Sequence, residues 1–201
     1  MKQNIAIIMG GYSPEVNISL KSGNVVYNHL NKEKYNPFRV HILKEKWVAL
    51  DEFNKEYYID KNDFSFILED KKIIFDCVFN AIHGIPGENG ELLAYLNLIG
   101  IKHTSANSYQ MGITFNKRDT LSIVKDYGVK TAKSIYLNKG NPIDLKAIID
   151  KVGLPCFIKP NNAGSSFGIS KAHSLAQITP AINKAFKEDT QILIESFLDG
   201  R

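Results

Sequence analysis

Hydrophobic residues recur along the chain with two different spacings, which together predict alternating strands and helices. A continuous apolar run over 4–9 has the length of a buried strand and ends at a pair of glycines. Helical spacing follows over 16–30, and a second strand is expected over 38–43. The next expected elements are turns and minor strands over 47–66, β-rich runs over 72–75 and 76–81, and a helix over 91–98. Strands that alternate with helices indicate a parallel sheet covered on both faces.

The pattern changes after Ile101, where a second domain is expected. Two consecutive helices are predicted over 108–127, with a break near 114–116. The remaining expected elements are a strand over 131–136, a helix over 144–152, a hairpin-like pair of strands over 155–172, a helix over 175–186 and a strand over 191–196. We therefore place a domain boundary near 102–107.

The composition is that of an ordinary soluble globular protein. Its 25 basic and 21 acidic residues form no basic stripe, so we expect small anionic substrates and no nucleic-acid partner. Cys77 and Cys156 lie in apolar runs typical of buried thiols, which fits a reducing cytoplasm. No run approaches the ~18 apolar residues of a membrane helix, and no signal peptide is recognisable, so neither membrane insertion nor secretion is expected.

Two glycine-rich loops are expected at the carboxyl edge of the first sheet, where open α/β sheets bind ligands. Residues 10–15, GGYSPE, follow the first strand, and residues 83–90, HGIPGENG, follow the strand that ends at Ala81. In the first loop, Glu15 is either a ligand contact or a helix-terminus residue behind a Ser13 or Asn17 cap. In the second, His83 is either a ligand contact or an ordinary loop histidine. Together the two loops predict a pocket wall.

Lys159 stands inside the apolar run 156–158, before a loop of small residues at 161–168. An ammonium in such a strand is costly unless an anion or a carboxylate meets it. Ser165 and Ser166 add hydroxyl and amide donors to the loop, whose glycines permit closure over an oligophosphate. The alternative is an ordinary hairpin turn. A Walker P-loop is excluded because GxxxxGK[ST] does not occur.

Two further signals are weaker by themselves. Lys117 opens a predicted helix, where a solvated lysine is the alternative to a ligand contact. Glu195 lies near the end of the last predicted strand, and Phe197 and Leu198 follow that strand. Together they suit the edge of a purine slot, with an apolar wall and a carboxylate to accept from an exocyclic amine. The alternative is a buried strand with one outward glutamate.

Five segments in this order resemble the D-alanine–D-alanine ligases of the ATP-grasp superfamily, over their N-terminal and central portion. The segments are GGYSPE with SLKSG at 19–23, HGIPGENG, the stretch 104–117, IKPNNAGSSFGISK at 158–171 and ILIESFLDG at 192–200. The resemblance implies an α/β fold with a Rossmann-like substrate domain at 1–103, whose sheet is open and parallel. It further implies an α+β ATP-grasp subdomain at 104–190 and the start of a C-terminal ATP-grasp subdomain at 191–201, the rest of which we expect beyond Arg201.

The resemblance also implies ATP-dependent ligation of two D-alanines through an acyl phosphate, for peptidoglycan precursors. Glu15 and Ser165 match catalytic residues of the family that also bind substrate, and His83 lies on the neighbouring substrate loop. The residues matched to the nucleotide are Lys117, Lys159 and Ser166 on the phosphates and Glu195, Phe197 and Leu198 at the adenine. Ligands for Mg²⁺ or Mn²⁺ are expected beyond Arg201, so the 201 residues alone are expected to be inactive. A homodimer is also implied.

Several positions depart from the family pattern and leave alternatives open. GENG stands where GEDG is common, Phe115-Asn116 where Met-Asp is usual, and Ala163 where a carboxylate is frequent. Val16-Asn17 replaces a common basic–acidic pair. A sister ligase that uses D-lactate or D-serine as second substrate is one alternative. A non-catalytic module that binds nucleotide or amino acid is the other, if the natural chain stops at residue 201.

Overall fold

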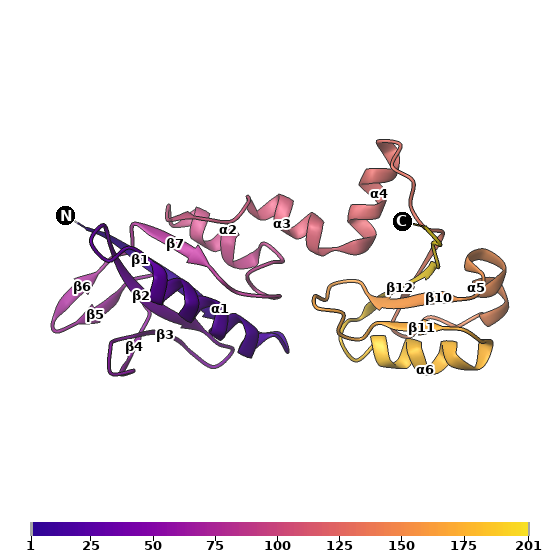
Figure 1. Ribbon diagram of the computed structural model, residues 1–201, viewed down its shortest axis with the longest axis horizontal. Coiled ribbons are helices and arrows are strands. Elements are labelled where there is room, and N and C mark those ends of the chain that lie inside the picture. The colour runs from indigo at the N-terminus through magenta and orange to yellow at the C-terminus, as the bar shows by residue number, and fades with distance from the viewer. Residues whose placement is uncertain (1, 201) are drawn as a thin grey trace. The chain divides into compact units, whose positions relative to one another are not determined.

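The computed structural model describes residues 2–200 and divides into two compact units, 1–112 and 113–201 (Figure 1). The domain limits expected from the sequence, 1–103, 104–190 and 191–201, stay predictions. The first unit ends within helix α3 (Ser108–Phe115), where the sequence placed a helix rather than a linker. No helix among residues 2–200 is both long enough and apolar enough to cross a membrane.

The first unit is built on a six-stranded sheet in the order β4-β3-β2-β1-β7-β8. Strands β2, β1, β7 and β8 are parallel, whereas β3 and β4 extend the sheet antiparallel. Its elements are β1 (Gln3–Gly10), α1 (Val16–His29), β2 (Tyr35–Ile42), β3 (Trp47–Leu50), β4 (Glu56–Tyr58), β5 (Phe66–Leu68), β6 (Lys71–Ile73), β7 (Cys77–Asn80), α2 (Glu91–Leu98) and β8 (Lys102–His103). The predicted parallel sheet is confirmed, and the minor strands of 47–66 enlarge it.

Strand β1 is buried on both faces because each face packs against a separate cluster. Ile7 and Met9 point to α1, and Ala6 and Ile8 join the larger core to which α2 contributes Leu93. A run buried on both faces is apolar at every position, which explains why β1 shows no alternation. The sheet thereby fixes the carboxyl ends of β1 and β7 side by side.

The run 72–75 does not join this sheet. Its first two residues, Lys72 and Ile73, belong to β6 (Lys71–Ile73), which pairs with β5 in a separate two-stranded sheet. Lys71 and Lys72 are exposed, so this short strand has one apolar residue to bury rather than a whole face. The predicted strand is therefore present, but it pairs with β5, its neighbour in the sequence, and not with the main sheet.

The second unit is a four-stranded antiparallel sheet in the order β11-β10-β12-β9, with helices α5 and α6 packed in one apolar core. Its elements are α4 (Lys117–Asp126), β9 (Ser134–Asn138), α5 (Leu145–Val152), β10 (Cys156–Pro160), β11 (Ser170–Ala172), α6 (Leu175–Ala185) and β12 (Gln191–Ser196). The predicted break between α3 and α4 is confirmed at Asn116, whose side chain caps α4 by accepting from Asp119 N at 3.0 Å.

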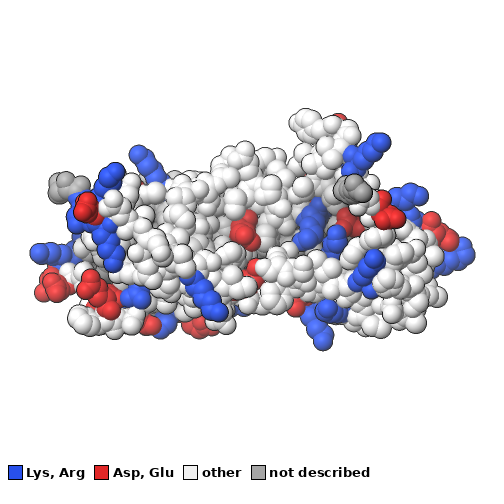
Figure 2. All heavy atoms as spheres, in the orientation of Figure 1, with Lys and Arg blue, Asp and Glu red and all other residues white. Residues whose placement is uncertain are grey.

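Charged side chains of both signs are interspersed on the face shown in Figure 2. This distribution is consistent with a formal charge of only +4. A charge divided in this way gives little long-range attraction to a polyanion. Any recognition of an anion must therefore come from individual lysines in local sites.

Candidate functional site

The two predicted glycine loops lie against one another at the ends of β1 and β7. Tyr12 N donates to Ile85 O at 2.7 Å, and Ser13 Oγ donates to His83 O at 3.0 Å. A left-handed φ of +75° at Gly84 allows the close approach, because a Cβ there would lie 2.6 Å from Ser13 Oγ. The two loops expected at one sheet edge are therefore in contact within the first unit.

Glu15 is 3% exposed and occupies the N-cap position of α1, but its side chain makes no capping hydrogen bond. Ser13 Oγ instead accepts from Glu15 N at 3.2 Å, so Ser13 orients the start of the helix. A Cβ at Gly84 would lie 3.3 Å from Glu15 Oε2, which places the carboxylate against the second loop. The helix-terminus explanation of Glu15 is thus incomplete, since the carboxylate faces the loop that carries His83.

His83 itself is held from α1. Its Nε2 lies 3.2 Å from Ser22 Oγ, in the second turn of the helix. Gly84 N, the next amide, donates to Glu88 Oε2 at 2.8 Å. The ring and its backbone are therefore oriented by two different side chains. Sequence reasoning found His83 but missed Ser22 and Glu88, which lie within the GGYSPE–SLKSG and HGIPGENG segments.

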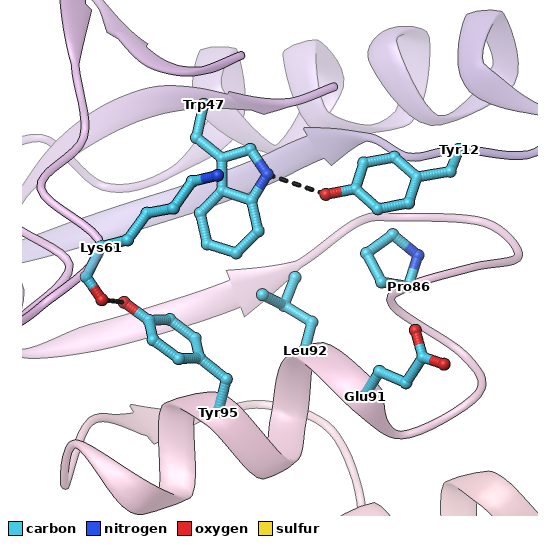
Figure 3. Close-up of a pocket in the computed structure, with 7 residues that line it drawn as sticks. All are labelled: Tyr12, Trp47, Lys61, Pro86, Glu91, Leu92 and Tyr95. Atoms are coloured by element: carbon cyan, nitrogen blue, oxygen red, sulfur yellow. Dashed lines mark hydrogen bonds between the residues drawn. The ribbon is translucent and has the colours of Figure 1, made fainter. Parts of the chain in front are cut away.

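A pocket of about 350 Å³ adjoins the same two loops on another side (Figure 3). Tyr12 and Pro86, one from each loop, line it together with Trp47, Lys61, Glu91, Leu92 and Tyr95. Trp47 Nε1 donates to the Tyr12 hydroxyl at 2.8 Å, and the Tyr95 hydroxyl donates to Lys61 O at 2.8 Å (Figure 3). These contacts tie the first loop to β3, so the loop is supported by aromatic packing as well as by its backbone.

Ser19 connects the carboxyl ends of the adjacent strands β1 and β7, and removal of its hydroxyl is expected to destabilise the first unit. It is fully buried, accepts from Gly10 N at 2.8 Å and donates to Ala81 O at 2.8 Å. Ser19→Ala leaves both backbone groups without this partner, so we expect the free energy of unfolding to fall by about 2 kcal/mol. The only tryptophan, Trp47, lies in this unit, and its fluorescence during denaturant unfolding measures the change.

Asn17→Ala is the matched control because Asn17 lies exposed on the same helix. Its substitution is expected to change the unfolding free energy by no more than about 0.5 kcal/mol. A loss for Ser19→Ala no larger than that for Asn17→Ala would show that the hydrogen bonds of Ser19 to the two strands add little to stability.

In the second unit, Lys159, Glu195, Phe197 and Leu198 line one pocket of about 460 Å³. Its other lining residues are Phe157 on β10, Leu121 and Val124 on α4, and Val129, Lys130, Thr131, Ala132 and Ser196. The rings of Phe157 and Phe197 are 6.1 Å apart, and Lys171 Nζ lies 3.7 Å from the centroid of Phe197. An apolar slot with a few polar groups suits a planar heterocycle. Sequence reasoning missed Lys171 and the α4 wall, although Lys171 ends the IKPNNAGSSFGISK segment.

The ammonium of Lys159 meets a carboxylate, as its apolar surroundings require. Its Nζ lies 2.6 Å from Glu195 Oε2, and the two side chains are 27% and 10% exposed. Both residues come from neighbouring antiparallel strands, β10 and β12, and they occupy diagonal positions in the register. The pair places a positive and a negative group at the same pocket, one suited to a phosphate and the other to an amine.

Lys117 lies beside the small-residue loop rather than in that pocket's lining. Its Nζ donates to Ala163 O at 2.7 Å and to Asn161 O at 3.3 Å. Burial lowers the pKa of Lys117 below its ordinary value, and the charge of Lys159 lowers this pKa further. The two lysines therefore act on each other electrostatically. A site that holds two mutually repelling ammonium groups favours an anion.

Ser165 and Ser166 lie in the connection between β10 and β11, so the predicted hairpin pairing is confirmed. Both have left-handed φ angles, 42° and 61°, which are strained for serine. Gly168 also has a positive φ, and a Cβ there would meet the Pro160 ring at 2.7 Å. The loop is consequently more than a tight turn. Strained, exposed serines beside two lysines suit a ligand-binding loop.

Among residues 2–200, no three His, Cys, Asp or Glu side chains are grouped so that they would hold a metal ion. Mg²⁺ prefers carboxylate and other oxygen ligands. The acidic groups near the loop, Glu195 and Asp189, are engaged by Lys159 and by Asn162 N at 2.6 Å. We therefore assign no magnesium ligand among residues 2–200, and ligands beyond Arg201 stay a prediction.

The two units define the class: this is part of an ATP-grasp fold preceded by an α/β domain with an open, mostly parallel sheet. The chain belongs to the D-Ala–D-Ala ligase family, because residues 4–106 match the family's N-terminal model and residues 123–201 match its C-terminal model. It is 62% identical over 198 residues to the D-alanine–D-alanine ligase of Flavobacterium johnsoniae. That alignment covers 98% of this chain and 61% of the relative.

Solved structures show the same relationship. D-alanyl-alanine synthetase A from Vibrio cholerae has a TM-score of 0.87 at 28% identity, with 100% of this chain and 60% of that chain covered. VanG D-Ala:D-Ser ligase from Enterococcus faecalis has a TM-score of 0.84 at 27% identity, with 100% and 64% covered. The chain thus spans about three fifths of the length of these proteins. Fold similarity extends to ligases with different second substrates.

Proposed function

We propose that this chain is the substrate- and nucleotide-binding part of an ATP-dependent D-alanine–D-alanine ligase that supplies peptidoglycan precursors and so maintains cell shape. The observation that carries this proposal is the pocket of the second unit, which four residues matched to the nucleotide site line together. Phe197 and Leu198 supply apolar contact to a purine, Glu195 accepts from its exocyclic amine, and Lys159 binds phosphate. Lys117 and Ser166 complete the phosphate contacts on the loop.

The amino-acid site is proposed for the glycine loops of the first unit. The buried carboxylate of Glu15 binds the ammonium of the first D-alanine, and His83 contacts the same substrate. Ser165 is proposed as a further substrate-binding and catalytic residue, on the small-residue loop between β10 and β11. Family membership supports these assignments, and so does the packing of Glu15 against the Gly84 backbone.

The proposed reaction has two steps. A carboxylate oxygen of the first D-alanine attacks the γ-phosphorus of ATP, and the bond to the β-phosphate oxygen breaks to release ADP. The amine of the second D-alanine then attacks the acyl carbon, phosphate leaves and the nitrogen loses a proton. Lys117 and Lys159 stabilise the charge that develops on the transferring phosphoryl group. Family membership further supports Mg²⁺ or Mn²⁺ as the nucleotide's counter-ion, a cytoplasmic location and a homodimer.

A fusion protein tests this function. Residues 1–201 replace the corresponding part of the Flavobacterium johnsoniae relative, whose remaining length supplies the rest of the site; we call this protein the fusion. We expect it to release phosphate from ATP only when D-alanine is present, with D-alanyl-D-alanine as the product. Coupled phosphate release and mass spectrometry measure both, and the unaltered relative is the control.

D-lactate and D-serine are tested as second substrates in parallel with D-alanine. An active relative beside an inactive, folded fusion contradicts the proposal. Turnover with D-lactate or D-serine in preference to D-alanine contradicts the substrate assignment, while retaining the ligase class. Nucleotide binding without turnover of any of the three would point to a non-catalytic binding module.

A further inference from the structure

Asn161 is a fully buried polar residue at the point where strand β10 ends and the small-residue loop begins. It is 1% exposed. The start of α4 and the start of β12 lie on either side of it. A buried amide needs partners for both of its polar atoms, because an unmatched donor or acceptor costs about 1–3 kcal/mol. The partners of Asn161 therefore show what it holds in place.

The side chain of Asn161 joins helix α4 to strand β12. Its Oδ1 accepts from Arg118 N at 2.8 Å, and its Nδ2 donates to Asn116 Oδ1 at 3.0 Å and Gln191 Oε1 at 3.0 Å. Arg118 N is one of the amides in the first helical turn that have no partner within the helix. Asn161 thus satisfies the first turn of α4 from outside and fixes its direction.

The backbone of Asn161 acts on the neighbouring residue, Lys117. Asn161 O accepts from Lys117 N and from Lys117 Nζ, each at 3.3 Å. The same ammonium donates to Ala163 O at 2.7 Å, two residues further along the loop. Lys117 is therefore held at both ends, at its amide and at its ammonium, by the segment that Asn161 anchors.

We propose that Asn161 is a positioning residue for the nucleotide site: its side chain holds the first turn of α4 so that the Lys117 ammonium stays on the phosphate-side loop. The inference rests on the proposed role of Lys117 in binding ATP phosphates. A lysine contributes a flexible point charge, so its value to a phosphate depends on how well the stem is held. Asn161 supplies this support although its buried side chain is not in the pocket lining.

The next asparagine provides a contrast. Asn162 donates through its backbone N and its Nδ2 to Asp189 Oδ2, at 2.6 and 3.0 Å, so both of these donors serve Asp189 rather than α4. It anchors the loop to the segment before β12. The two adjacent asparagines therefore have different roles: Asn162 fixes the loop, whereas Asn161 connects the loop to the helix that bears Lys117.

The test is a double-mutant cycle in the fusion, with Asn161→Ala, Lys117→Met and the double variant. If Asn161 acts through Lys117, Asn161→Ala weakens ATP binding about tenfold in the parent but has little further effect in the Lys117→Met background. The KM for D-alanine is expected to stay within about twofold, because the substitution displaces a lysine of the proposed phosphate site and leaves the glycine loops untouched. Calorimetric ATP titration and steady-state kinetics give the two measurements.

Asp144→Ala is the matched control because it removes the cap of α5, where Asp144 Oδ1 accepts from Ala147 N at 3.0 Å, without touching Lys117. It is expected to lower stability but leave ATP affinity unchanged. If Asn161→Ala fails to fold, Asn116→Ala removes the acceptor of Asn161 Nδ2 and enters the same cycle.

Equal weakening of ATP binding with and without Lys117 would overturn the positioning role. So would a loss for D-alanine as large as the loss for ATP. If Lys159→Ala weakens ATP binding while Asn161→Ala does not, the proposed function stands and only the role of Asn161 fails. A folded fusion that binds no ATP overturns the proposed function and this inference with it.

Discussion

Lys159→Ala is expected to weaken ATP binding by the fusion about 100-fold, which corresponds to about 2.7 kcal/mol. The reason is the loss of a charge-assisted contact to phosphate from a lysine that the strand holds in a fixed position at the pocket. D-alanine binding is expected to change little, because Glu15 and His83 lie on loops of the first unit. Isothermal titration with ATP and with D-alanine measures each effect separately.

The same substitution has a structural consequence that must be separated from the binding effect. Glu195 is 10% exposed and would lose the ammonium 2.6 Å from its Oε2. A largely buried carboxylate that loses its positively charged partner destabilises the fold. Because Lys159 is itself 27% exposed, we expect the free energy of unfolding to fall by about 2 kcal/mol. Weak ATP binding by Lys159→Ala alone would therefore have two explanations.

The double variant Lys159→Ala/Glu195→Gln distinguishes them. Glutamine carries no charge that needs a partner, so stability is expected to recover, while ATP affinity stays low. Thermal unfolding and ATP titration are compared for the double variant and for each single variant. Recovery of ATP affinity together with stability would mean that Lys159 serves the fold by neutralising Glu195 and does not bind phosphate.

Glu15→Gln is expected to lower kcat/KM for D-alanine by about 100-fold, with ATP affinity unchanged. Glutamine keeps the shape of the buried side chain but removes the negative charge that would pair with the substrate's ammonium. Glu15 is 3% exposed, so its charge attracts a cation more strongly than a surface carboxylate would, because less water screens the interaction. Steady-state kinetics at saturating ATP gives the value.

Glu91→Gln is the control for a helix-terminus effect. Glu91 is an exposed carboxylate in the first turn of α2, so it interacts with a helix dipole. It lines the pocket beside Tyr12 and Pro86, whereas the Glu15 carboxylate lies beside Gly84. It is expected to leave kcat/KM unchanged. If Glu15→Gln also leaves it unchanged, Glu15 is only a helix-terminus residue and the proposed amino-acid site is wrong.

Regular elements could be predicted from residue spacing because they depend on local periodicity. The doubly buried strand β1, the short helix α2 and the break at Asn116 are examples. The two glycine loops were predicted to share one sheet edge, and the hydrogen bond from Tyr12 N to Ile85 O confirms it. Parallel strands place their carboxyl ends together, so chain order alone was enough.

Strand partners were harder to predict. The polar stretch 47–66 contains β3 and β4, which extend the main sheet antiparallel, whereas β6 pairs with β5 and stays outside it. Short strands with one apolar residue carry too little patterning to specify a partner. Their pairing is decided by which sheet edge the preceding turns can reach.

The sequence by itself determined the family, the order of strands and helices, and the residue types available to each loop, because these follow from local spacing and from five ordered segments. Only the tertiary structure decided that Lys159 is paired with Glu195, that Lys171 covers Phe197, and that Asn161 joins α4 to β12. These contacts link residues far apart in the chain, between 26 and 36 positions in the pairs Lys171–Phe197, Asn161–Gln191 and Lys159–Glu195. Their strength depends on burial and on distances of a few ångströms, which no local pattern encodes.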